Sequence, residues 1–227
     1  MKPNTTTALA SPSALLPSPF GIGLATSIVC LLPIIPGLLL WDQLPDQLII
    51  HWDAAGEPNG YVPKAIGVFG LPLLMCGINL LLQFGMRTDP KIENASKTLV
   101  LLAKWIIPVL TLILMPITLF ASMGVPIPIQ VIVPVFLGVL LIAIGNYLPK
   151  SKQSYTVGIR LPWTLHSEEN WNRTHHLAGY LWILGGVLLL FGAFLPAVWF
   201  LPLLGILLIL VAGIPFIYSY GLYRKGV

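Results

Sequence analysis

The residues of this chain that could carry chemistry gather in two segments between long apolar runs. The first segment, residues 42–65, contains His51, Asp53 and Glu57 and ends near Lys64. A β-prone stretch at 48–53 is followed by two turn signals, at 53–56 and 57–60. Because alternate side chains of a strand lie on one face, His51 and Asp53 are expected on the same side, with Glu57 across the turn.

Three interpretations of this small polar site follow from its residue types. His51 and Asp53 are of metal-ligand types, but Glu57 is not assured as a third ligand, so we predict no metal and no cofactor. Asp53 can instead accept a hydrogen bond from His51 and fix a folded cap. The segment can also bind an external peptide or another ligand.

The second segment, residues 149–176, carries helix-start and turn chemistry. Ser167 resembles an N-cap, followed by two acidic residues in the first turn, where the helix dipole favours them. Glu169 and Arg173 form an (i, i+4) pair, and the spacing predicts a helix that continues into the next apolar run. His175 and His176 point about 100° apart on such a helix, which favours capping or packing over joint coordination of one metal.

The part of this segment before Ser167 is expected to fold rather than to act as a plain linker. Gly158 permits a close approach of the backbone, and Pro162 ends any element before it. Arg160 stands three positions before Trp163, so its guanidinium can stack on the indole or bind a carboxylate or phosphate.

The elements that must position these segments are six runs without any charged residue. Each run is 18 residues or longer, and only 9% of the whole chain is charged, against about 25% in soluble domains. A helix of this length can cross a hydrocarbon core of about 30 Å. The runs are residues 20–41, 66–86, 105–122, 127–148, 177–194 and 197–222.

These runs predict an all-α membrane protein with six transmembrane helices. The runs are continuous rather than alternating, which excludes the strands of a β-barrel. We expect a flexible N-terminal tail (1–19), then three helices (20–122) with the long loop 42–65, then three more (123–227) with the long loop 149–176. The first run is expected to stay as an anchor rather than a cleaved signal peptide, because no small-residue cleavage pattern follows it.

The basic residues predict how the chain is oriented. With six spans, 11 of the 12 basic residues fall on one face and Lys64 alone on the other. The positive-inside rule then places both termini and loop 149–176 in the cytoplasm, and loop 42–65 outside. We therefore call residues 42–65 the outer loop and residues 149–176 the inner loop. This topology accounts for the net charge of +4 without a nucleic-acid partner.

The arrangement of loop lengths suggests a 3+3 inverted repeat. Polar residues inside the runs (Asn79, Gln83, Thr111, Thr118, Gln130) are expected to make interhelical hydrogen bonds. No ionisable residue lies in the middle of a run, which argues against ion-coupled transport. Cys30 and Cys76 both lie in spans, so no disulfide framework is expected.

Motifs in both loops are similar to those of the SdpI family of bacterial membrane proteins. The inner motif comprises Asn146-Tyr-Leu-Pro-Lys150, Tyr155-Thr-Val-Gly-Ile-Arg160-Leu-Pro-Trp-Thr-Leu165 and Glu168-Glu-x-Trp171-x-x-Thr174-His175. The outer pattern, Leu44-Pro45, His51-Trp52-Asp53, Gly56-Glu57-Pro58 and Lys64, is similar to a domain of unknown function often found at the N-terminus of that family. Together the resemblance covers roughly residues 20–220.

The resemblance implies a multi-pass plasma-membrane immunity protein surrounded by membrane lipids. The family's named member protects against a secreted membrane-active toxic peptide, and signals by holding a transcriptional repressor at the membrane. By this resemblance, the outer loop would recognise or exclude a toxic peptide through His51, Asp53, Gly56, Glu57 and Lys64. The inner loop would couple to a cytoplasmic partner through Asn146, Tyr155, Gly158, Arg160, Pro162, Trp163, Thr164, Trp171 and His175.

Two other function classes remain open. A small transporter or flippase without ion coupling is compatible with a 3+3 repeat. An intramembrane enzyme would have to use His51, Asp53 and Glu57 on one side or Arg160, Glu168 and His175 on the other. Neither set has the spacing of a nucleophile and its base, so we expect no catalytic residue.

Overall fold

Six helical segments long and apolar enough to cross a membrane are found in the part of the chain that the structure describes. The structure is a computed structural model that describes residues 19–53 and 55–227. The predicted flexible tail therefore lies almost wholly outside the described residues. The expected all-α membrane fold is confirmed. Many large apolar side chains point outward, such as Leu81 (73% exposed) and Phe191 (74%), as lipid-facing residues would.

The first span is broken in the middle. Helix α1 (Pro19–Val29) is followed by tight turns and by α2 (Ile34–Leu39). Pro33 and Pro36 have no N–H to give to the carbonyls four residues earlier. The chain between the two helices instead forms hydrogen bonds between residues three positions apart, such as that from the N–H of Leu32 to the carbonyl of Val29 at 3.2 Å.

A two-stranded antiparallel hairpin, β1 (Gln47–Trp52) and β2 (Pro58–Pro63), follows the first span. The expected strand is confirmed, and the turn expected at 53–56 is found, with the N–H of Gly56 donating to the carbonyl of Asp53 at 3.0 Å. The turn expected at 57–60 is wrong, because Pro58, Asn59 and Gly60 belong to β2. A π-helical turn (η2, Ile66–Gly70) then leads into α3 (Leu71–Thr88), and a single 3₁₀ turn (η3, Ile92–Asn94) leads into α4 (Lys97–Ser122).

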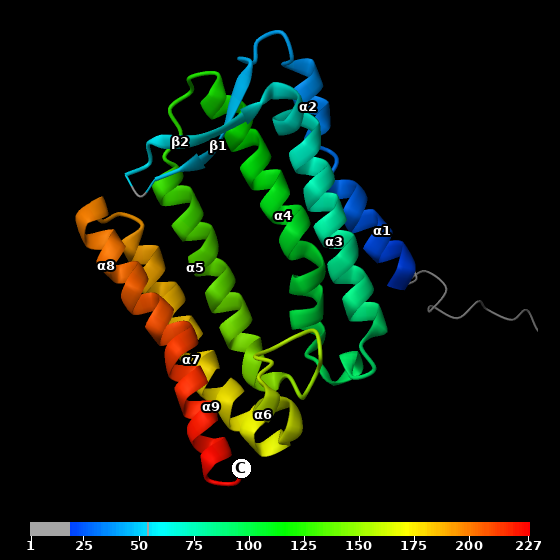
Figure 1. Ribbon diagram of the computed structural model, residues 1–227, viewed down its shortest axis with the longest axis vertical. Helices are drawn as coiled ribbons and strands as arrows, with labels where there is room; N and C mark the ends of the chain where they lie inside the picture. The colour runs from blue at the N-terminus through cyan, green and yellow to red at the C-terminus, as the bar shows by residue number, and fades with distance from the viewer. Residues whose placement is uncertain (1–18, 54) are drawn as a thin grey trace, which may run out of the picture.

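The second half begins with α5 (Ile129–Tyr147) and a 3₁₀ turn (η4, Leu148–Lys150). The short helix α6 (Pro162–His166) precedes α7 (Glu168–Gly192). The sixth span comprises α8 (Ala197–Leu208), a π-helical turn (η5, Ile209–Gly213) and α9 (Ile214–Arg224). The two long loops lie at opposite ends of the bundle, with the C-terminus at the end of the inner loop (Figure 1).

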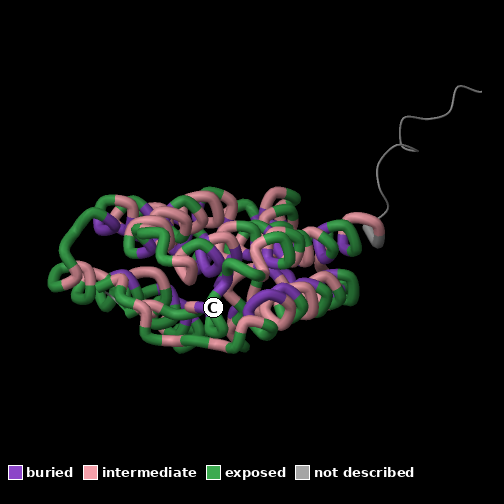
Figure 2. The backbone as a smooth tube through the Cα atoms, turned by 90° about the horizontal axis from the view of Figure 1, so that it is seen from above, coloured by how far each residue is buried: buried purple, intermediate pink, exposed green. Residues whose placement is uncertain are grey.

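Helices α5 and α7 pack closely through glycines. A Cβ atom on Gly138 would lie 2.8 Å from the carbonyl oxygen of Gly186, and one on Gly145 would lie 2.8 Å from that of Gly179. Without water to drive association, such close backbone contact is a main source of helix pairing in lipid. Seen from above, the buried residues lie between the helices while the outward faces are largely exposed (Figure 2).

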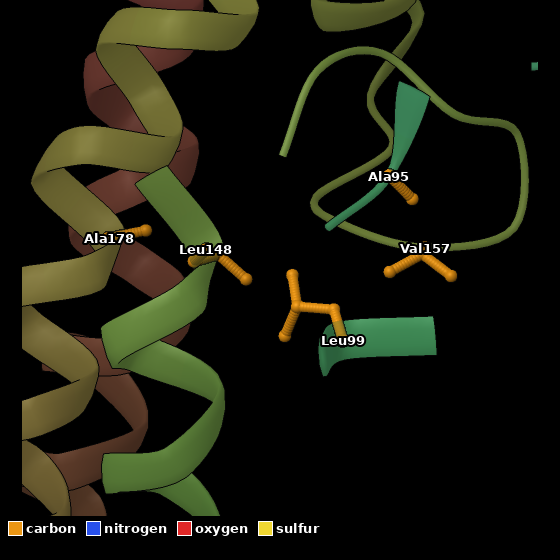
Figure 3. Close-up of a cluster of buried hydrophobic side chains, with 5 residues drawn as sticks. All are labelled: Ala95, Leu99, Leu148, Val157 and Ala178. Carbon is orange, nitrogen blue, oxygen red and sulfur yellow. The ribbon is translucent and has the colours of Figure 1, made fainter. Parts of the chain in front are cut away.

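Helix α4 has one end in each of two buried apolar clusters. Near its start, Leu99 packs with Ala95, Leu148, Val157 and Ala178 beside the inner loop (Figure 3). Near its end, Leu119 packs with Leu44, Leu48 and Val68 beneath the outer hairpin. Leu119 stands 20 positions after Leu99, which is about 30 Å along the helix, so α4 connects the two loops directly.

Candidate functional site

A cavity of about 300 Å³ lies between the outer hairpin and helices α4, α5 and α8. Its polar lining comes from His51 and Asp53 of the hairpin, Thr118 of α4 and Gln130 of α5. The apolar lining comprises Ile50, Trp52, Leu114, Ile129, Val133, Pro134 and Phe200. A mostly apolar cavity with a few polar groups at one side is the usual form of a binding site for small ligands, which fill about 300–1,000 Å³.

The turn of the hairpin is fixed by the carboxylate of Asp53. Its Oδ1 accepts hydrogen bonds from the main-chain N–H groups of Ala55 (2.8 Å) and Glu57 (3.0 Å). Gly56 has φ +87°, and a Cβ atom there would lie 2.6 Å from Oε1 of Gln130. The positive φ favours glycine at this position, and the added Cβ would meet only the flexible end of the Gln130 side chain.

The expected hydrogen bond between His51 and Asp53 is wrong. The Nδ1 atom of His51 instead contacts Oδ1 of Asn59 across the hairpin. The strand register shifts on both sides of His51, because Ile50 is an extra residue in β1 and Asn59 is an extra residue in β2. Strand β1 ends at Trp52, so Asp53 lies in the turn, where the alternation of strand faces no longer applies and its carboxylate accepts main-chain hydrogen bonds.

The five predicted outer residues do not form one site. His51 and Asp53 line the cavity, and Gly56 lies against Gln130. Glu57 is exposed, and its main-chain atoms hold the turn. Lys64 lies elsewhere: its Nζ donates to the carbonyl of Trp41 (3.1 Å) and stands 5.2 Å from the centre of the Trp41 ring.

At the other end of the bundle, Asp89 attaches the inner loop to the first half of the chain. Its Oδ2 accepts hydrogen bonds from Ser154 Oγ (2.6 Å), Thr156 Oγ1 (2.7 Å) and the N–H groups of Tyr155 (2.9 Å) and Thr156 (3.0 Å). Its Oδ1 accepts from the N–H of Lys91 (2.8 Å). We call Asp89, Ser154, Tyr155 and Thr156 the Asp89 cluster.

Two opposing effects set the charge of Asp89, whose side chain is buried. Burial by itself raises the pKa of this carboxyl. Hydrogen bonds from Ser154 and Thr156 favour the charged form and together hold the pKa of Asp89 below its usual value. Asp89 is therefore a carboxylate at neutral pH, and all its partners are donors.

Main-chain contacts extend the attachment along residues 94–96. The N–H of Lys152 donates to the carbonyl of Asn94 at 3.0 Å, and the N–H of Ser96 donates to Ser151 Oγ at 3.2 Å. Asn94 Nδ2 donates in turn to the carbonyl of Gln153 at 3.3 Å. The inner loop is thus joined to the residues directly before α4.

The inner loop closes over His175 and Trp171, which are fully buried. His175 Nε2 accepts a hydrogen bond from the N–H of Ile159 (2.8 Å), and Nδ1 lies 2.8 Å from the carbonyl of Trp171, so the proton belongs on Nδ1. The two rings stack with centroids 3.9 Å apart, and Trp171 Nε1 donates to the carbonyl of Ser151 (2.7 Å). Packing, the expected role of His175, is what this geometry shows.

Thr164 and Pro162 hold the short helix α6 at the end of the loop. Thr164 Oγ1 accepts from the N–H of Leu161 (2.9 Å), and its carbonyl accepts from Gln153 Nε2 (2.8 Å). Pro162 occupies the first helical position, where its missing N–H costs nothing.

The expected pairing of Arg160 with Trp163 is not found. Arg160 NH1 donates to the carbonyl of Tyr155 at 3.1 Å. The Trp163 ring packs instead on three aromatic rings of α9, those of Phe216, Tyr220 and Tyr223, with centroids 5.4–5.8 Å apart. The short loop between α7 and α8 brings the sixth span back beside the inner loop, so aromatic side chains of α9, rather than Arg160, contact the indole.

The predicted inner residues from Tyr155 to His175 thus form one folded unit, while Asn146 lies exposed near the end of α5. Tyr155, Arg160 and Pro162 are exposed members of this unit. The expected helix N-cap is confirmed, since Ser167 Oγ accepts from the N–H of Asn170 (3.1 Å). The expected Glu169–Arg173 ion pair is also confirmed, at 2.6 Å.

Sequence reasoning missed the residues that join distant segments. Asp89 carries a signal in hindsight, because an Asp-Pro pair directly after a span is an unusual place for an acid among neighbouring lysines. Gln130 was expected to make an interhelical hydrogen bond but faces the cavity. Among residues 19–53 and 55–227, no three His, Cys, Asp or Glu side chains gather closely enough to hold a metal ion.

Comparison with known proteins finds matches for both loops. The SdpI/YfhL protein family matches residues 150–219, from the inner loop into α9, and a domain of unknown function (DUF1648) matches residues 28–76, around the outer hairpin. The Immunity protein SdpI of Bacillus subtilis (strain 168) is 29% identical over 198 residues, covering 87% of this chain and 93% of that protein. No solved structure matches the chain. The resemblance to the SdpI family that the two motifs indicate is therefore confirmed, and the chain is a multi-pass bacterial membrane protein similar to an immunity protein.

Proposed function

We propose that this protein confers immunity to an external, membrane-active toxic peptide, and that the cavity under the outer hairpin receives apolar side chains of that peptide. The observation that supports this most is the cavity itself, which is lined by residues of the hairpin and by apolar residues of three helices. A peptide that inserts into membranes carries exposed apolar side chains, and burying one such side chain gains about 1.5–3 kcal/mol.

The polar groups at the hairpin suit the main chain and charges of a peptide. His51 and Asp53 are exposed where they line the cavity. Only Oδ1 of the Asp53 carboxylate accepts the two turn hydrogen bonds, so Oδ2 is available to a cationic group. An apolar cavity with a carboxylate beside it favours a peptide that has a Lys, an Arg or a free N-terminus near apolar residues.

A survival assay tests this proposal. The chain is expressed in a Bacillus subtilis strain that lacks its own SdpI, and the cells are exposed to the toxic peptide. We expect survival with the wild-type chain and loss of protection with Val133→Phe, which fills part of the cavity. Val139→Phe is the matched control, because Val139 lies on the same helix but is 55% exposed away from the cavity. Equal protection by both variants would show that the cavity is not the site of peptide binding. Absence of protection by the wild-type chain would contradict the proposed immunity function.

The orientation on which this site depends is also a proposal. In a chain whose Cys30 and Cys76 are replaced by Ala, a cysteine at position 51 should react with an impermeant thiol reagent in intact cells. A cysteine at position 160 should react only after permeabilisation. The reverse pattern would place the hairpin in the cytoplasm and end its proposed contact with an external peptide.

We further propose that the inner loop passes the state of the outer hairpin to a cytoplasmic partner, for which a repressor protein is the example implied by the family. Helix α4 supports this, because its last turn binds β1 and its first turn follows residues 94–96, which are hydrogen-bonded to residues 151–153 of the inner loop. The exposed Tyr155 and Arg160 would meet the partner. A pull-down of cytoplasmic proteins with the Tyr155→Ala, Arg160→Gln chain should lose a partner that the wild type retains.

The cavity also bears on the alternative of an intramembrane enzyme, since His51 and Asp53 line it together. Mass spectrometry of the peptide after incubation with the purified protein separates the two functions. An immunity protein that binds leaves the mass of the peptide unchanged, whereas an enzyme would shorten or modify it.

A further inference from the structure

A second cavity, of about 400 Å³, lies on the outward surface of α7 and α9, at the end of the bundle that carries the inner loop. Helix α9 packs against α7 here (Figure 1). We call this cavity the α7–α9 groove. Its lining residues are Asn172, Arg173, His176, Leu177, Tyr180 and Tyr218.

We propose that the α7–α9 groove binds one anionic phospholipid, with the phosphate at Arg173 and the acyl chains along Leu177 and Tyr180. This proposal does not depend on the immunity function. Both helices that form the groove are candidate membrane spans, so lipid is the molecule that covers it in a membrane.

The order of residues along α7 gives the groove a polar and an apolar end. Arg173 stands five residues after Glu168, where α7 begins, and Tyr180 stands seven residues further, which is about 10 Å along the helix axis. This is the depth that separates lipid phosphates from the upper part of the acyl chains. Tyr180 (71% exposed) and Tyr218 (38% exposed) are the aromatic side chains that favour this interface.

The polar end has hydrogen-bond donors to offer a phosphate. Arg173 uses NH2 for Glu169, and a guanidinium has five N–H donors in all, so further donors are available. The side chain of Arg173 is 53% exposed. His176 Nδ1 lies 3.2 Å from the carbonyl of Asn172, so its proton belongs on Nδ1 and Nε2 is an acceptor, which leaves Arg173 as the donor to the phosphate.

Glu169 sets the strength of the site. Its carboxylate pairs with Arg173 and therefore lowers the positive potential that a phosphate meets. A groove built around an unpaired arginine would bind anions more tightly. Removing the charge of Glu169 should consequently strengthen binding, while removing the charge of Arg173 should weaken it.

Binding of phosphatidylglycerol to the purified full chain, measured by native mass spectrometry, tests the proposal. We expect the wild type to retain one phosphatidylglycerol in preference to phosphatidylcholine. Arg173→Gln should abolish this preference, with a loss of about fivefold. Glu169→Gln should increase retention by a similar factor.

The matched control is Lys152→Gln, which removes an exposed positive charge at the same end of the bundle but outside the groove. An equal loss of phosphatidylglycerol in this variant would overturn the proposal in favour of a diffuse surface charge. Glycerol phosphate, which has the headgroup without acyl chains, separates a lipid site from a phosphate site. Displacement of the lipid by glycerol phosphate at equal concentration would show that the acyl chains contribute nothing, and would also overturn it.

Discussion

The side-chain amide of Gln83 donates a hydrogen bond of 3.2 Å to the carbonyl oxygen of Lys104 on the neighbouring helix. Inside an unbroken helix that carbonyl would accept from the residue four positions later, which here is Pro108 and has no N–H. Gln83 therefore supplies the donor that the proline removes. In lipid an unsatisfied carbonyl cannot turn to water, so the neighbouring helix has to satisfy it.

The second half of the chain contains the same arrangement. Pro215 offers no N–H to the carbonyl of Val211, and the indole Nε1 of Trp182 donates to that carbonyl at 2.8 Å. Both prolines thus interrupt a span where a side chain of another span is placed to compensate. The two hydrogen bonds join α3 to α4 and α7 to the sixth span.

Replacing Gln83 by Leu should destabilise the protein by about 1–2 kcal/mol, because the carbonyl of Lys104 loses its donor while the volume is kept. Thermal unfolding in detergent measures the change. Phe84→Leu is the control, since Phe84 is 67% exposed on the same helix and should leave the transition where it is. An unchanged transition in Gln83→Leu would mean that a water molecule or a shift of α4 replaces the amide.

Replacing Trp182 by Phe should cost about 1 kcal/mol, because the aromatic ring remains while the N–H to Val211 is lost. The same unfolding measurement applies. If the hydrogen bonds from Gln83 and Trp182 act independently, the effects of Gln83→Leu and Trp182→Phe should add in the double variant, since the two residues lie in different halves of the chain. A double variant no less stable than either single one would show that the two prolines act on one shared motion.

Replacing Asp89 by Asn should destabilise the attachment of the inner loop by about 3 kcal/mol at neutral pH. An amide offers one acceptor and presents an NH₂ group to donors that previously met a carboxylate. Ser154→Ala is the milder comparison, since it removes one of the four donors to Oδ2. Hydrogen exchange of the Tyr155 and Thr156 amides, which bind Asp89 directly, should accelerate in both variants and most in Asp89→Asn.

The pH dependence of this attachment follows from the same carboxylate. The pKa of Asp89 is lower in the folded protein than its usual value near 3.9, so its contribution is fully present above that value. The contribution is lost as the pH falls through about 3.9 toward the lower folded pKa. The difference in stability between the wild type and Asp89→Asn should therefore shrink on acidification below about pH 4. A difference that stays constant down to about pH 3 would contradict the assignment of a charged Asp89.

How much the sequence could predict depends on whether a feature is local. The spans, the N-cap at Ser167 and the Glu169–Arg173 pair are set by residues a few positions apart, and all were predicted. The Asp89 cluster joins residues 65–67 positions apart, and the cavity combines a hairpin with three helices. No periodic pattern in the sequence indicates which residues so far apart are in contact. The end of β1 at Trp52 shows a local failure as well, because the expected pairing of His51 with Asp53 assumed that the strand continued to Asp53.

Replacing Gly158 by Ala should destabilise the inner loop for two separable reasons. Gly158 has φ +116°, which an L-residue adopts only with strain, and the added Cβ would lie 2.7 Å from His175 Nε2. Gly124→Ala is a matched control for the first reason, since Gly124 has φ +84° and a Cβ atom added there would meet no atom of the described residues within 4 Å. We expect about 1 kcal/mol for Gly124→Ala and clearly more for Gly158→Ala, by thermal unfolding. Equal costs would mean that His175 moves aside freely.

The contact between β1 and α4 gives the last prediction. The N–H of Ile49 donates to Ser122 Oγ (2.8 Å), which itself donates to the carbonyl of Thr118 (2.6 Å), and Thr118 lines the outer cavity. Ser122→Ala should leave the Ile49 amide without its partner and increase its hydrogen exchange, while Ser122→Thr, which keeps the hydroxyl, should restore protection. Because α4 begins beside the inner loop, the proposed signalling requires the exchange of Tyr155 and Thr156 to respond as well. A response confined to the hairpin would show that α4 anchors the outer loop without carrying its state across the membrane.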